Sequence, residues 1–339
     1  MKSPTIIYDF NDLTEPHLVF GDGETGQDIK RRVPCFGGFV GSQALHNHTH
    51  HRLIIGSIFW KSIVAREGVS GAKILSNALL SEINNLTPHG SFNDLKPDNE
   101  KISRIRKKLT GPDRTYFDIY HDLRIDGDDE KFFERVPSVS PNSSQYIDVL
   151  KDKSLCPNHI LDIGAFDGAD SATFLDEFPG SCVTAFEPNI SAIHQGPHSF
   201  LGNSSRVKLL NFALADQPSR VTLAQNESRS TTLNVRARHE SPEKQIVQTT
   251  LDALTQSKIV SEFDYLKIDT EGNEKRIIEG AAESIKKIRP VLAVAVYHQP
   301  SDFYEIPCLL LDLLGDDCNL HFRFYSETFI DFICYLIPR

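Results

Sequence analysis

The sequence has no apolar run of about 18 residues, the length that a helix needs to span a membrane. Its first residues, MKSPTIIYDFNDL, also lack the long apolar core of a secretory signal. We therefore expect a protein that does not insert into membranes and that works in the cytoplasm.

Paired cysteines and an excess of basic residues are missing as well. No two of the six cysteines form a CxxC pair, so neither a zinc site nor a disulfide framework is predicted. Asp and Glu (46 residues) outnumber Lys and Arg (36), which gives a formal net charge of -10 at pH 7. Nucleic-acid binding requires clustered, excess positive charge, so we expect no nucleic-acid partner.

The sequence divides into three zones, and the first two precede the predicted main sheet. Residues 1–92 alternate short apolar runs (HLVF, FGGFV, HRLIIGSIFW) with helix-like segments such as ETGQDIKRRV, which predicts a small Rossmann-like α/β domain. Residues 93–146 are polar and helix-prone, with a basic run, KISRIRKKL, ahead of an acidic one, DGDDEKFFER. Such charge runs favour a solvated helical connector over a docking surface.

The third zone, residues 147–339, contains a ladder of apolar strands separated by helix-length segments. These strands are HILDIG, CVTAFEP, VKLLNFALA, FDYLKIDT and PVLAVAVYH. Two more apolar segments, CNLHFRFYS and FIDFICYLIPR, follow each other closely, as in an antiparallel hairpin. The order predicts an α/β fold with a doubly wound sheet and an antiparallel C-terminal hairpin.

The segment HILDIGAFDGADSATF combines a strand, a glycine turn and a helix start at the first strand of this sheet. Gly164 and Gly168 let a ligand approach the backbone, and the helix from about Ala169 directs free amides toward the same place. The turn also carries three carboxylates, on Asp162, Asp167 and Asp170. They would repel a pyrophosphate but suit S-adenosyl-L-methionine, which has a sulfonium, an ammonium and no phosphate. The glycine spacing also departs from G-x-G-x-x-G.

The next two strands support the same ligand. Glu187, at the end of CVTAFEPN, follows Gly164 at close to the spacing of about 20 residues expected for an acid that binds ribose hydroxyls. A lone acid after a strand is also often a helix cap, but the glycine turn before it favours the ribose role. Sheet order places Asn211 to Ala213, in LLNFALAD, where adenine would lie.

These segments together resemble the FkbM-type family of S-adenosylmethionine-dependent methyltransferases, many of which methylate hydroxyls on sugars or polyketides. The matching pieces are QYIDVL, LDIGAFDGADSATF, AFEPN, NFALAD, LKIDTEGNEKRIIEGA, RPVLAVAVYHQPSDFYEIP and RFYSETFIDFICYLIP, which cover nearly all of residues 145–339. D-x-E-G-x-E followed by I-x-G-A is the most specific of them. The resemblance implies a class I methyltransferase fold and a cofactor pocket formed by Asp162, Gly164, Ala165, Phe166, Asp167, Gly168, Glu187, Pro188, Asn211, Ala213 and Asp269.

Methyl transfer to a hydroxyl needs an aligned donor, exclusion of water, and a base or a metal for the hydroxyl proton. YLKIDTEGNE ends the fourth strand with Asp269 and Glu271, and Glu274 follows on the next helix. VYHQPSD brings His298 and Asp302 to the same rim of the sheet. We therefore expect the catalytic residues to be His298, Asp269, Glu271 and Asp302.

Structural roles compete with these catalytic ones. Asp269 is also a suitable helix N-cap, and Glu271 a first-turn acid that stabilises the helix dipole. His298 is either the base or a histidine held by ordinary hydrogen bonds. We favour it as the base because its unperturbed pKa is the nearest to neutrality. A divalent metal held by Asp269 and Glu271 is the alternative mechanism, and no resident metal is predicted.

The first zone has two motifs of its own. Gly21, Gly23 and Gly26 form a G-x-G-x-x-G after HLVF, but acidic residues lie within it and none follows between Asp28 and Glu67 to bind a ribose. Some larger FkbM-type proteins carry a similar domain in front, so a scaffold or subunit-contact role is favoured over ligand binding. HNHTHH places three histidines, His46, His48 and His50, on one face of an extended segment, where a solvated patch is favoured over a zinc or nickel site.

We expect an S-adenosylmethionine-dependent methyltransferase that acts on a hydroxyl of a glycan or secondary metabolite. Its partners would be that small-molecule or glycan acceptor and a second copy of the chain, through the N-terminal domain. Two rival functions are a non-catalytic binding protein on a methyltransferase fold and a nicotinamide-dependent oxidoreductase that uses the N-terminal glycine motif.

Overall fold

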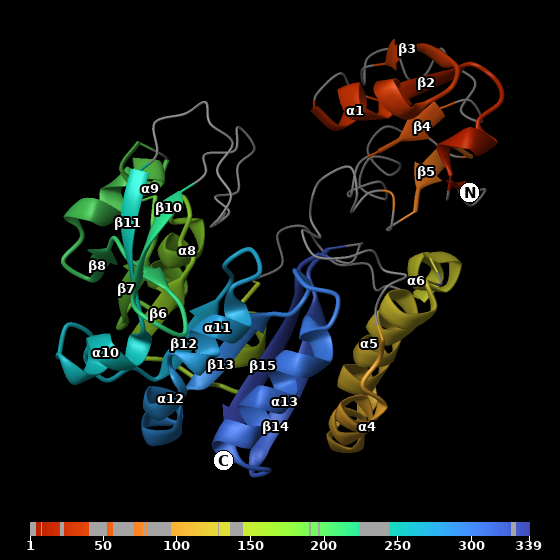
Figure 1. Cartoon of the computed structure of the whole chain (residues 1–339). Coiled ribbons are helices and arrows are strands. Elements are labelled where there is room, and N and C mark those ends of the chain that lie inside the picture. Colours follow the sequence, from red (N-terminus) through yellow and green to blue (C-terminus); the bar gives the residue numbers. More distant parts are fainter. Residues whose placement is uncertain are drawn as a thin grey trace.

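The computed structural model describes residues 5–7, 9–20, 24–40, 53–56, 71–76, 79, 96–127, 129–135, 145–189, 191–195, 197–223, 244–326 and 330–339. Figure 1 shows a small N-terminal α/β unit and a larger α/β unit that contains the C-terminus. No helix in the described ranges is long and apolar enough to cross a membrane.

The larger unit is built on a seven-stranded sheet with the order β14-β15-β13-β12-β6-β7-β8. The strands are β6 (His159–Ile163), β7 (Cys182–Phe186), β8 (Val207–Leu210), β12 (Tyr265–Ile268), β13 (Val291–Ala295), β14 (Cys318–Phe324) and β15 (Phe332–Pro338). β15 pairs antiparallel with both β13 and β14, so the antiparallel strand lies one in from the edge. The doubly wound sheet and its C-terminal hairpin are thereby confirmed.

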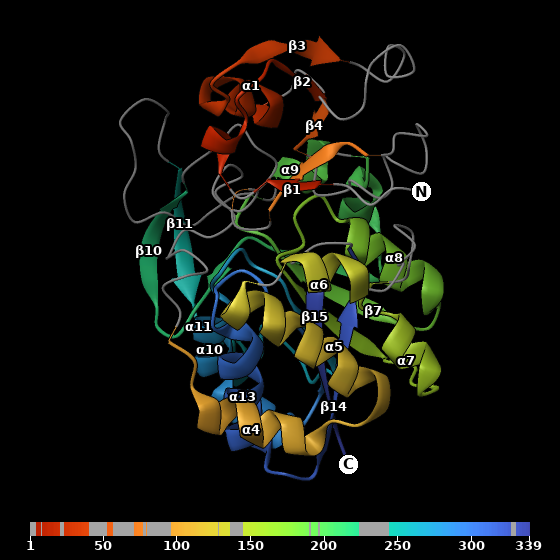
Figure 2. The same ribbon diagram turned by 90° about the vertical axis from the view of Figure 1, so that its right-hand side faces the viewer.

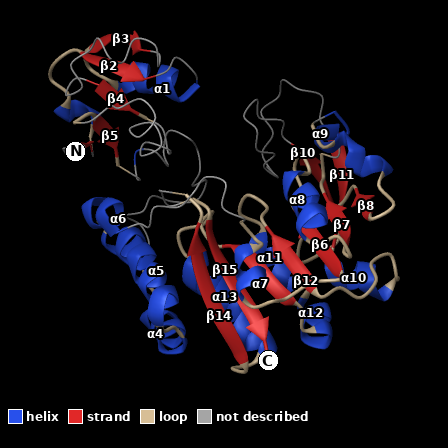
Figure 3. Cartoon of the chain, turned by 180° about the vertical axis from the view of Figure 1, so that it is seen from behind, coloured by secondary structure: helices blue, strands red, loops and turns tan. Residues whose placement is uncertain are grey.

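Alternation of side chains along the central strands separates the core into two layers. Leu161 and Leu266 point into one apolar cluster, whereas Ile160 and Tyr265 point into another on the opposite face. The first layer contains residues of α10 (Leu251–Gln256), α11 (Glu274–Glu279), α12 (Ala282–Ile288) and α13 (Asp302–Leu314). The second contains α7 (Asp148–Asp152), α8 (Ala169–Glu177) and α9 (Ser191–Gln195) (Figure 3). Both faces are covered, as the nearly unbroken apolar strands require.

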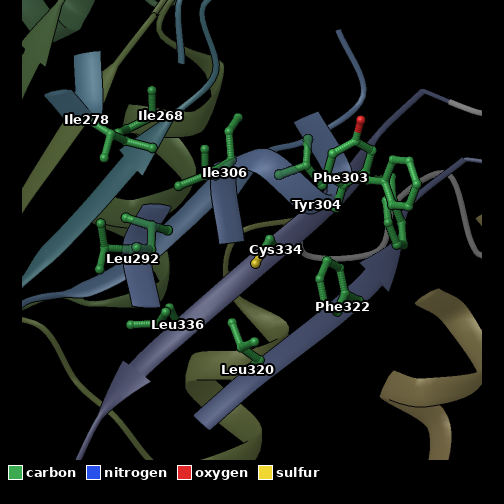
Figure 4. Packing of buried hydrophobic residues seen from close by; sticks show 14 of the residues in the cluster. Ile268, Ile278, Leu292, Phe303, Tyr304, Ile306, Leu320, Phe322, Cys334 and Leu336 are labelled. Carbon is green, nitrogen blue, oxygen red and sulfur yellow. The ribbon is translucent and has the colours of Figure 1, made fainter. Parts of the chain in front are cut away.

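The C-terminal hairpin fills the core beside α13. Cys334 of β15 faces Phe322 of β14 across the pair and lies among Leu292, Ile306 and Leu336 (Figure 4). All of these side chains are buried. This apolar packing holds β13, whose carboxyl end carries His298, against the rest of the sheet.

The predicted helical connector forms α4 (Asn99–Lys108), α5 (Gly111–His121) and α6 (Asp129–Arg135), with a π-helical turn at Asp122–Asp126. α4 packs against α13, and α5 packs against β14 (Figure 2). Phe117 of α5 is fully buried between the rings of Phe303 and Phe322, at centroid distances of 5.6 and 5.3 Å. These helices are therefore part of the main core rather than a solvated link, and Lys101, Arg104 and Lys108 of the basic run form ion pairs with Glu305, Asp312 and Asp316.

The N-terminal unit has a five-stranded sheet, with the order β1-β5-β4-β2-β3 and every pair parallel. Its elements are β1 (Thr5–Ile7), β2 (His17–Phe20), α1 (Glu24–Arg32), β3 (Phe36–Val40), β4 (Leu53–Ile55) and β5 (Lys73–Leu75). This is the Rossmann-like arrangement that the sequence predicts, with β1 as an additional strand. Gly21, Gly23 and the three histidines of HNHTHH lie outside the described residues.

A second small sheet, which the sequence pattern does not reveal, stands beside β8. It has the order β10-β11-β9 and consists of β9 (Ala213–Leu214), β10 (Ser219–Leu223) and β11 (Lys244–Thr249). The predicted strand VKLLNFALA is divided between β8 and β9 because Asn211 interrupts it. The Asn211 side-chain amide donates hydrogen bonds to the carbonyls of Glu187 and Pro188, at 3.1 and 2.7 Å.

Candidate active site

A cavity of about 440 Å³ opens at the carboxyl ends of β6, β7 and β12, where the strand order of the sheet reverses. This is the position at which doubly wound sheets bind ligands, and the volume is within the range of roughly 300–1,000 Å³ for small-molecule pockets. Nine of the residues expected at the site line it: Gly164, Ala165, Phe166, Asp167, Glu187, Pro188, Ala213, Asp269 and Glu271.

Asp162, Gly168, Asn211, His298 and Asp302 were also expected at the site but do not line the cavity. Asn211 is used in the turn between β8 and β9, and Gly168 is the N-cap of α8 with a φ of 87°. The other three are buried next to the cavity wall. Their contacts show what each contributes.

Asp162 and Lys267 form a buried ion pair behind the glycine turn. The register of β6 and β12 sets the two residues opposite each other, and Lys267 Nζ lies 2.9 Å from Asp162 Oδ1. Lys267 Nζ also lies 3.2 Å from Asp170 and donates to the carbonyl of Gly164 at 2.8 Å. Burial alone would lower the pKa of Lys267, but the two aspartates raise it above its ordinary value. Asp162 therefore fixes the turn through Lys267 and does not present its charge to the cavity.

Gly164 brings β6 and β12 into close approach at the cavity floor. Its φ is 83°, and a Cβ atom there would lie 1.8 Å from the carbonyl oxygen of Asp269. Any larger residue would push the two strand ends apart. The glycine that the sequence places in this turn is thus required by the approach of the neighbouring strand.

Glu187 stands on the opposite wall with its carboxylate held by backbone amides. Phe166 N donates to Oε2 at 2.9 Å, and Asn189 N donates to Oε1 at 2.6 Å. Burial raises the pKa of Glu187, and these two amides oppose that rise. Each carboxylate oxygen has further lone pairs, so Glu187 can accept hydrogen bonds from a diol in the cavity.

Two residues of the wall adopt left-handed backbone conformations that side chains disfavour. Phe166 has a φ of 47° and Glu271 a φ of 56°, and both line the cavity. Each such residue costs on the order of 1–3 kcal/mol, and such strain is concentrated at functional sites. The two strained residues lie on either side of the cavity, after β6 and after β12.

Asp269 is positioned by a tyrosine from outside the sheet. The Tyr146 hydroxyl donates to Asp269 Oδ2 at 2.6 Å, and the Tyr265 hydroxyl donates to the Tyr146 carbonyl at 2.6 Å. Tyr146 is 1% exposed, so this bond is shielded from water. The remaining oxygen, Oδ1, is directed toward His298.

His298 lies within a cluster of three carboxylates. Its Nδ1 is 2.9 Å from Glu274 Oε1, and its Nε2 is 3.6 Å from Asp269 and 3.7 Å from Glu271. Burial would lower the pKa of His298, but the carboxylates, Glu274 foremost, raise it to about 10. The ring is therefore an imidazolium at neutral pH, which argues against the choice of His298 as the base.

Glu274 and Asp302 complete this buried region. Glu274 is 1% exposed, and its Oε1 accepts from the Thr270 amide at 2.7 Å. Asp302 is 4% exposed and accepts from the Gln299 amide at 2.8 Å. Burial, together with repulsion from Glu274, raises the pKa of Asp302 to about 7. Asp302 thus supports the β13–α13 turn from behind the cavity.

The domain can now be assigned. The family model of the methyltransferase FkbM domain matches residues 162–324. The chain contains a methyltransferase FkbM domain. The predicted resemblance and the class I methyltransferase fold are confirmed by this match and by the strand order.

One of the matching solved structures has a similar fold over nearly the whole chain. Methyltransferase FkbM from Methylobacillus flagellatus matches 96% of this chain and 90% of its own, at 15% identity and a TM-score of 0.64. An SAH-bound methyltransferase from Podospora anserina has 14% identity, coverage of 72% and 98%, and a TM-score of 0.32. An O-methyltransferase from Bacillus cereus in complex with SAH has 14% identity, with 70% of this chain and 96% of its own covered, and a TM-score of 0.36. The last two TM-scores are too low to support a conclusion about the fold of this chain. No curated protein matches the sequence.

Several residues of the FkbM domain site were not expected from the sequence. Leu214, Lys267, Asn273 and Tyr297 also line the cavity. Lys267 could have been found, because a lysine inside the apolar run YLKI requires a buried partner. Tyr146 lies in QYIDVL, which the resemblance includes, but nothing in its spacing indicates a bond to Asp269. Tyr297 carries no signal that separates it from a core residue.

Proposed function

We propose that this chain is an S-adenosylmethionine-dependent O-methyltransferase that acts on a hydroxyl of a glycan or secondary metabolite. The observation that carries the proposal is Glu187, fixed by two amides at the end of β7 and facing the cavity of the FkbM domain. A carboxylate at this strand end is where a class I fold binds the ribose of its cofactor.

The chemistry of the cavity fits this cofactor. Carboxylates of Asp167, Asp170, Glu187, Asp269 and Glu271 line it, whereas the ammonium of Lys267 is paired with Asp162 and Asp170. A negative lining suits a ligand with a sulfonium and an ammonium and disfavours a pyrophosphate. Phe186, Phe212 and Leu214 supply apolar surface for an adenine. The residues therefore fit S-adenosylmethionine, which supplies a methyl group on an electrophilic sulfur.

Asp269 and Glu271 line the cavity, and in the proposed mechanism they face the acceptor. Asp269 is held rigidly by Tyr146 and would orient the acceptor hydroxyl. Burial raises the pKa of Glu271, although His298 opposes the rise, and its side chain is 39% exposed. A carboxylate with a raised pKa and access to water is suited to accept the hydroxyl proton and release it.

The proposed location is the cytoplasm, because all six cysteines are free thiols, as a reducing compartment keeps them. The proposed partners are the acceptor and a second copy of the chain through the N-terminal unit. Nucleic acid and membranes are not among them.

A transfer assay tests this function. The full chain would be incubated with methyl-labelled S-adenosylmethionine and fractions of metabolites and glycans, with Glu271→Gln in parallel. We expect label on a hydroxyl product, and turnover lowered by about 10²–10⁴-fold in the variant with unchanged cofactor affinity. Tight cofactor binding without transfer to any fraction would favour the non-catalytic rival.

A further inference from the structure

The cluster around His298 has more hydrogen-bonding capacity than it uses. His298 is 3% exposed and Glu274 is 1% exposed, so water does not solvate either side chain. Within the described residues, His298 Nε2 and Glu274 Oε2 are buried without a hydrogen-bond partner, whereas His298 Nδ1 lies 2.9 Å from Glu274 Oε1. Leaving such atoms unpaired costs roughly 1–3 kcal/mol each. Two such atoms in one cluster point to a missing binding partner.

The distances on the Nε2 side of His298 match shared coordination better than direct hydrogen bonding. Asp269, Glu274 and His298 each offer one ligand atom, and these atoms lie within 4.8 Å of one another. The separation of His298 Nε2 from Asp269 Oδ1 is 3.6 Å, which is beyond an ordinary hydrogen bond. Two donor atoms that each bind one cation at about 2.0–2.2 Å are separated by up to about 4 Å.

The charges point to a cation. Asp269, Glu271 and Glu274 surround a single imidazole, and the neighbouring Lys267 is paired with Asp162 and Asp170. A divalent cation would balance the carboxylates and bind one ring nitrogen of His298. Two carboxylates with one imidazole are a donor set that suits Mn²⁺, because imidazole is a poorer ligand for Mg²⁺.

We propose that Asp269, Glu274 and His298 hold a divalent cation of the Mn²⁺ type at the wall of the cavity, and that the cation displaces one proton of the His298 imidazolium when it binds. Glu271 stays outside the ligand set and remains available as the base. Asp269 lines the cavity, so the open coordination positions of the cation would face the acceptor hydroxyl and lower its pKa. This catalytic role rests on the proposed function, whereas the binding itself does not.

A second cluster in the chain provides a matched control. His121, Asp122 and Asp126 also bring potential ligand atoms within 4.8 Å of one another, near the end of α5. Asp126 is exposed, and no unpaired buried atom occurs at that cluster among the described residues. Asp126→Asn therefore removes a carboxylate from a cluster that we do not expect to bind.

Mn²⁺ binding by the full chain would be measured by electron paramagnetic resonance of the free ion, for wild type, Asp269→Asn, Glu274→Gln and Asp126→Asn. We expect one Mn²⁺ per chain in wild type and in Asp126→Asn, and affinity at least about 10-fold lower in the two cluster variants. Both substitutions keep an acceptor oxygen for Tyr146 or Thr270, and circular dichroism would confirm the fold.

Absence of binding, equal affinity in the cluster variants, or loss only in Asp126→Asn would overturn the proposal. Titration of the same samples with S-adenosylhomocysteine separates the two claims. Cofactor binding without Mn²⁺ binding would remove the metal and leave the proposed function. Mn²⁺ binding without cofactor binding would support the metal site and contradict the proposed function.

Discussion

Lys267 is the residue on which the geometry of the cavity floor depends most. It is 1% exposed, and it joins the strand end of β6, the start of α8 and β12 through Asp162, Asp170 and the Gly164 carbonyl. Removing one partner of a buried ion pair leaves the other charge without compensation. The stability of the turn and the shape of the cofactor cavity are therefore linked through one ammonium group.

Replacement of this lysine should be costly. We expect Lys267→Met to lower the free energy of unfolding by about 3–5 kcal/mol, because Asp162 would remain buried and charged. Urea denaturation measures the change. Lys275→Met is the control, since Lys275 is half exposed and its bond to Glu305 contributes at most about 1 kcal/mol. Similar losses in both variants would contradict the assignment.

Glu187 should affect binding more than folding. Glu187→Ala is expected to weaken S-adenosylhomocysteine binding by roughly 1–3 kcal/mol, the contribution of hydrogen bonds from a charged group to the ribose. Calorimetry provides the measurement, and Glu279→Ala, an exposed acid on α11, is the control. An unchanged affinity in the Glu187 variant would remove the ribose assignment.

Asp302 should make the free energy of unfolding fall as the pH rises. Burial raises its pKa from 3.8 to about 7, so the folded state binds a proton that the unfolded chain releases. Its contribution to stability is present below about pH 4 and is lost as the pH rises through 7. In Asp302→Asn, which cannot titrate, the loss between about pH 4 and pH 8 should be smaller, by on the order of 1–4 kcal/mol.

Urea denaturation of wild type and Asp302→Asn at about pH 4 and about pH 8, with a chelator present, measures the change in the free energy of unfolding. Asp312→Asn is the control, because Asp312 lies on the same helix but is exposed. An identical pH dependence in wild type and Asp302→Asn would show that the carboxyl is already charged in the folded protein.

At the scale of elements, the helices α4–α6 are the least expected feature. Their sequence shows strong charge runs, but Phe117 and Ile105 are fully buried, and Arg124 donates to the carbonyl of Tyr297, next to His298. The connector therefore supports the strand that carries the candidate catalytic cluster. Its many charged residues conceal this role from composition alone.

Shortened proteins test the connector. Residues 93–339 should fold and bind S-adenosylhomocysteine, whereas residues 136–339, which lack α4–α6, should expose Phe303 and Phe322 and lose the cooperative thermal transition. Differential scanning calorimetry makes the comparison. A folded 93–339 protein that does not bind would place part of the site in the N-terminal unit. Full binding by residues 136–339 would show that the helices are dispensable.

Local patterns in the sequence predicted the strands of the main sheet because short continuous apolar runs and glycine turns are local signals. HILDI became β6 and CVTAF became β7 at the same residues. The break at Asn211 and the ion pair of Lys267 could not be predicted in the same way. Each depends on partners that are far away in the sequence, Glu187 for the first and Asp162 for the second.

The same distinction holds for the candidate site. Motif spacing brought Gly164, Glu187 and Asp269 to one cavity, because strand ends of a parallel sheet meet at one edge. The pKa of His298 in the folded protein could not be read from the sequence because it depends on Glu274, Asp269 and Glu271 together. Positions on strands were predictable, whereas protonation depends on the assembled cluster.

At the scale of the whole molecule, two α/β units follow each other in one chain, and in the sequence each has glycines after a strand. The chemistry that we assign belongs to the second unit, whose cavity is negative and lined by Glu187. The nicotinamide rival would instead require binding at the first unit, after β2. The central claim is therefore that the second unit, and not the first, binds the cofactor.

Calorimetric titration of the full chain with S-adenosylhomocysteine, and separately with NADH, tests this claim most directly. We predict one S-adenosylhomocysteine bound per chain with a Kd in the micromolar range, about -8 kcal/mol, and no heat with NADH. Binding of NADH without S-adenosylhomocysteine would contradict the assignment and transfer the function to the N-terminal unit.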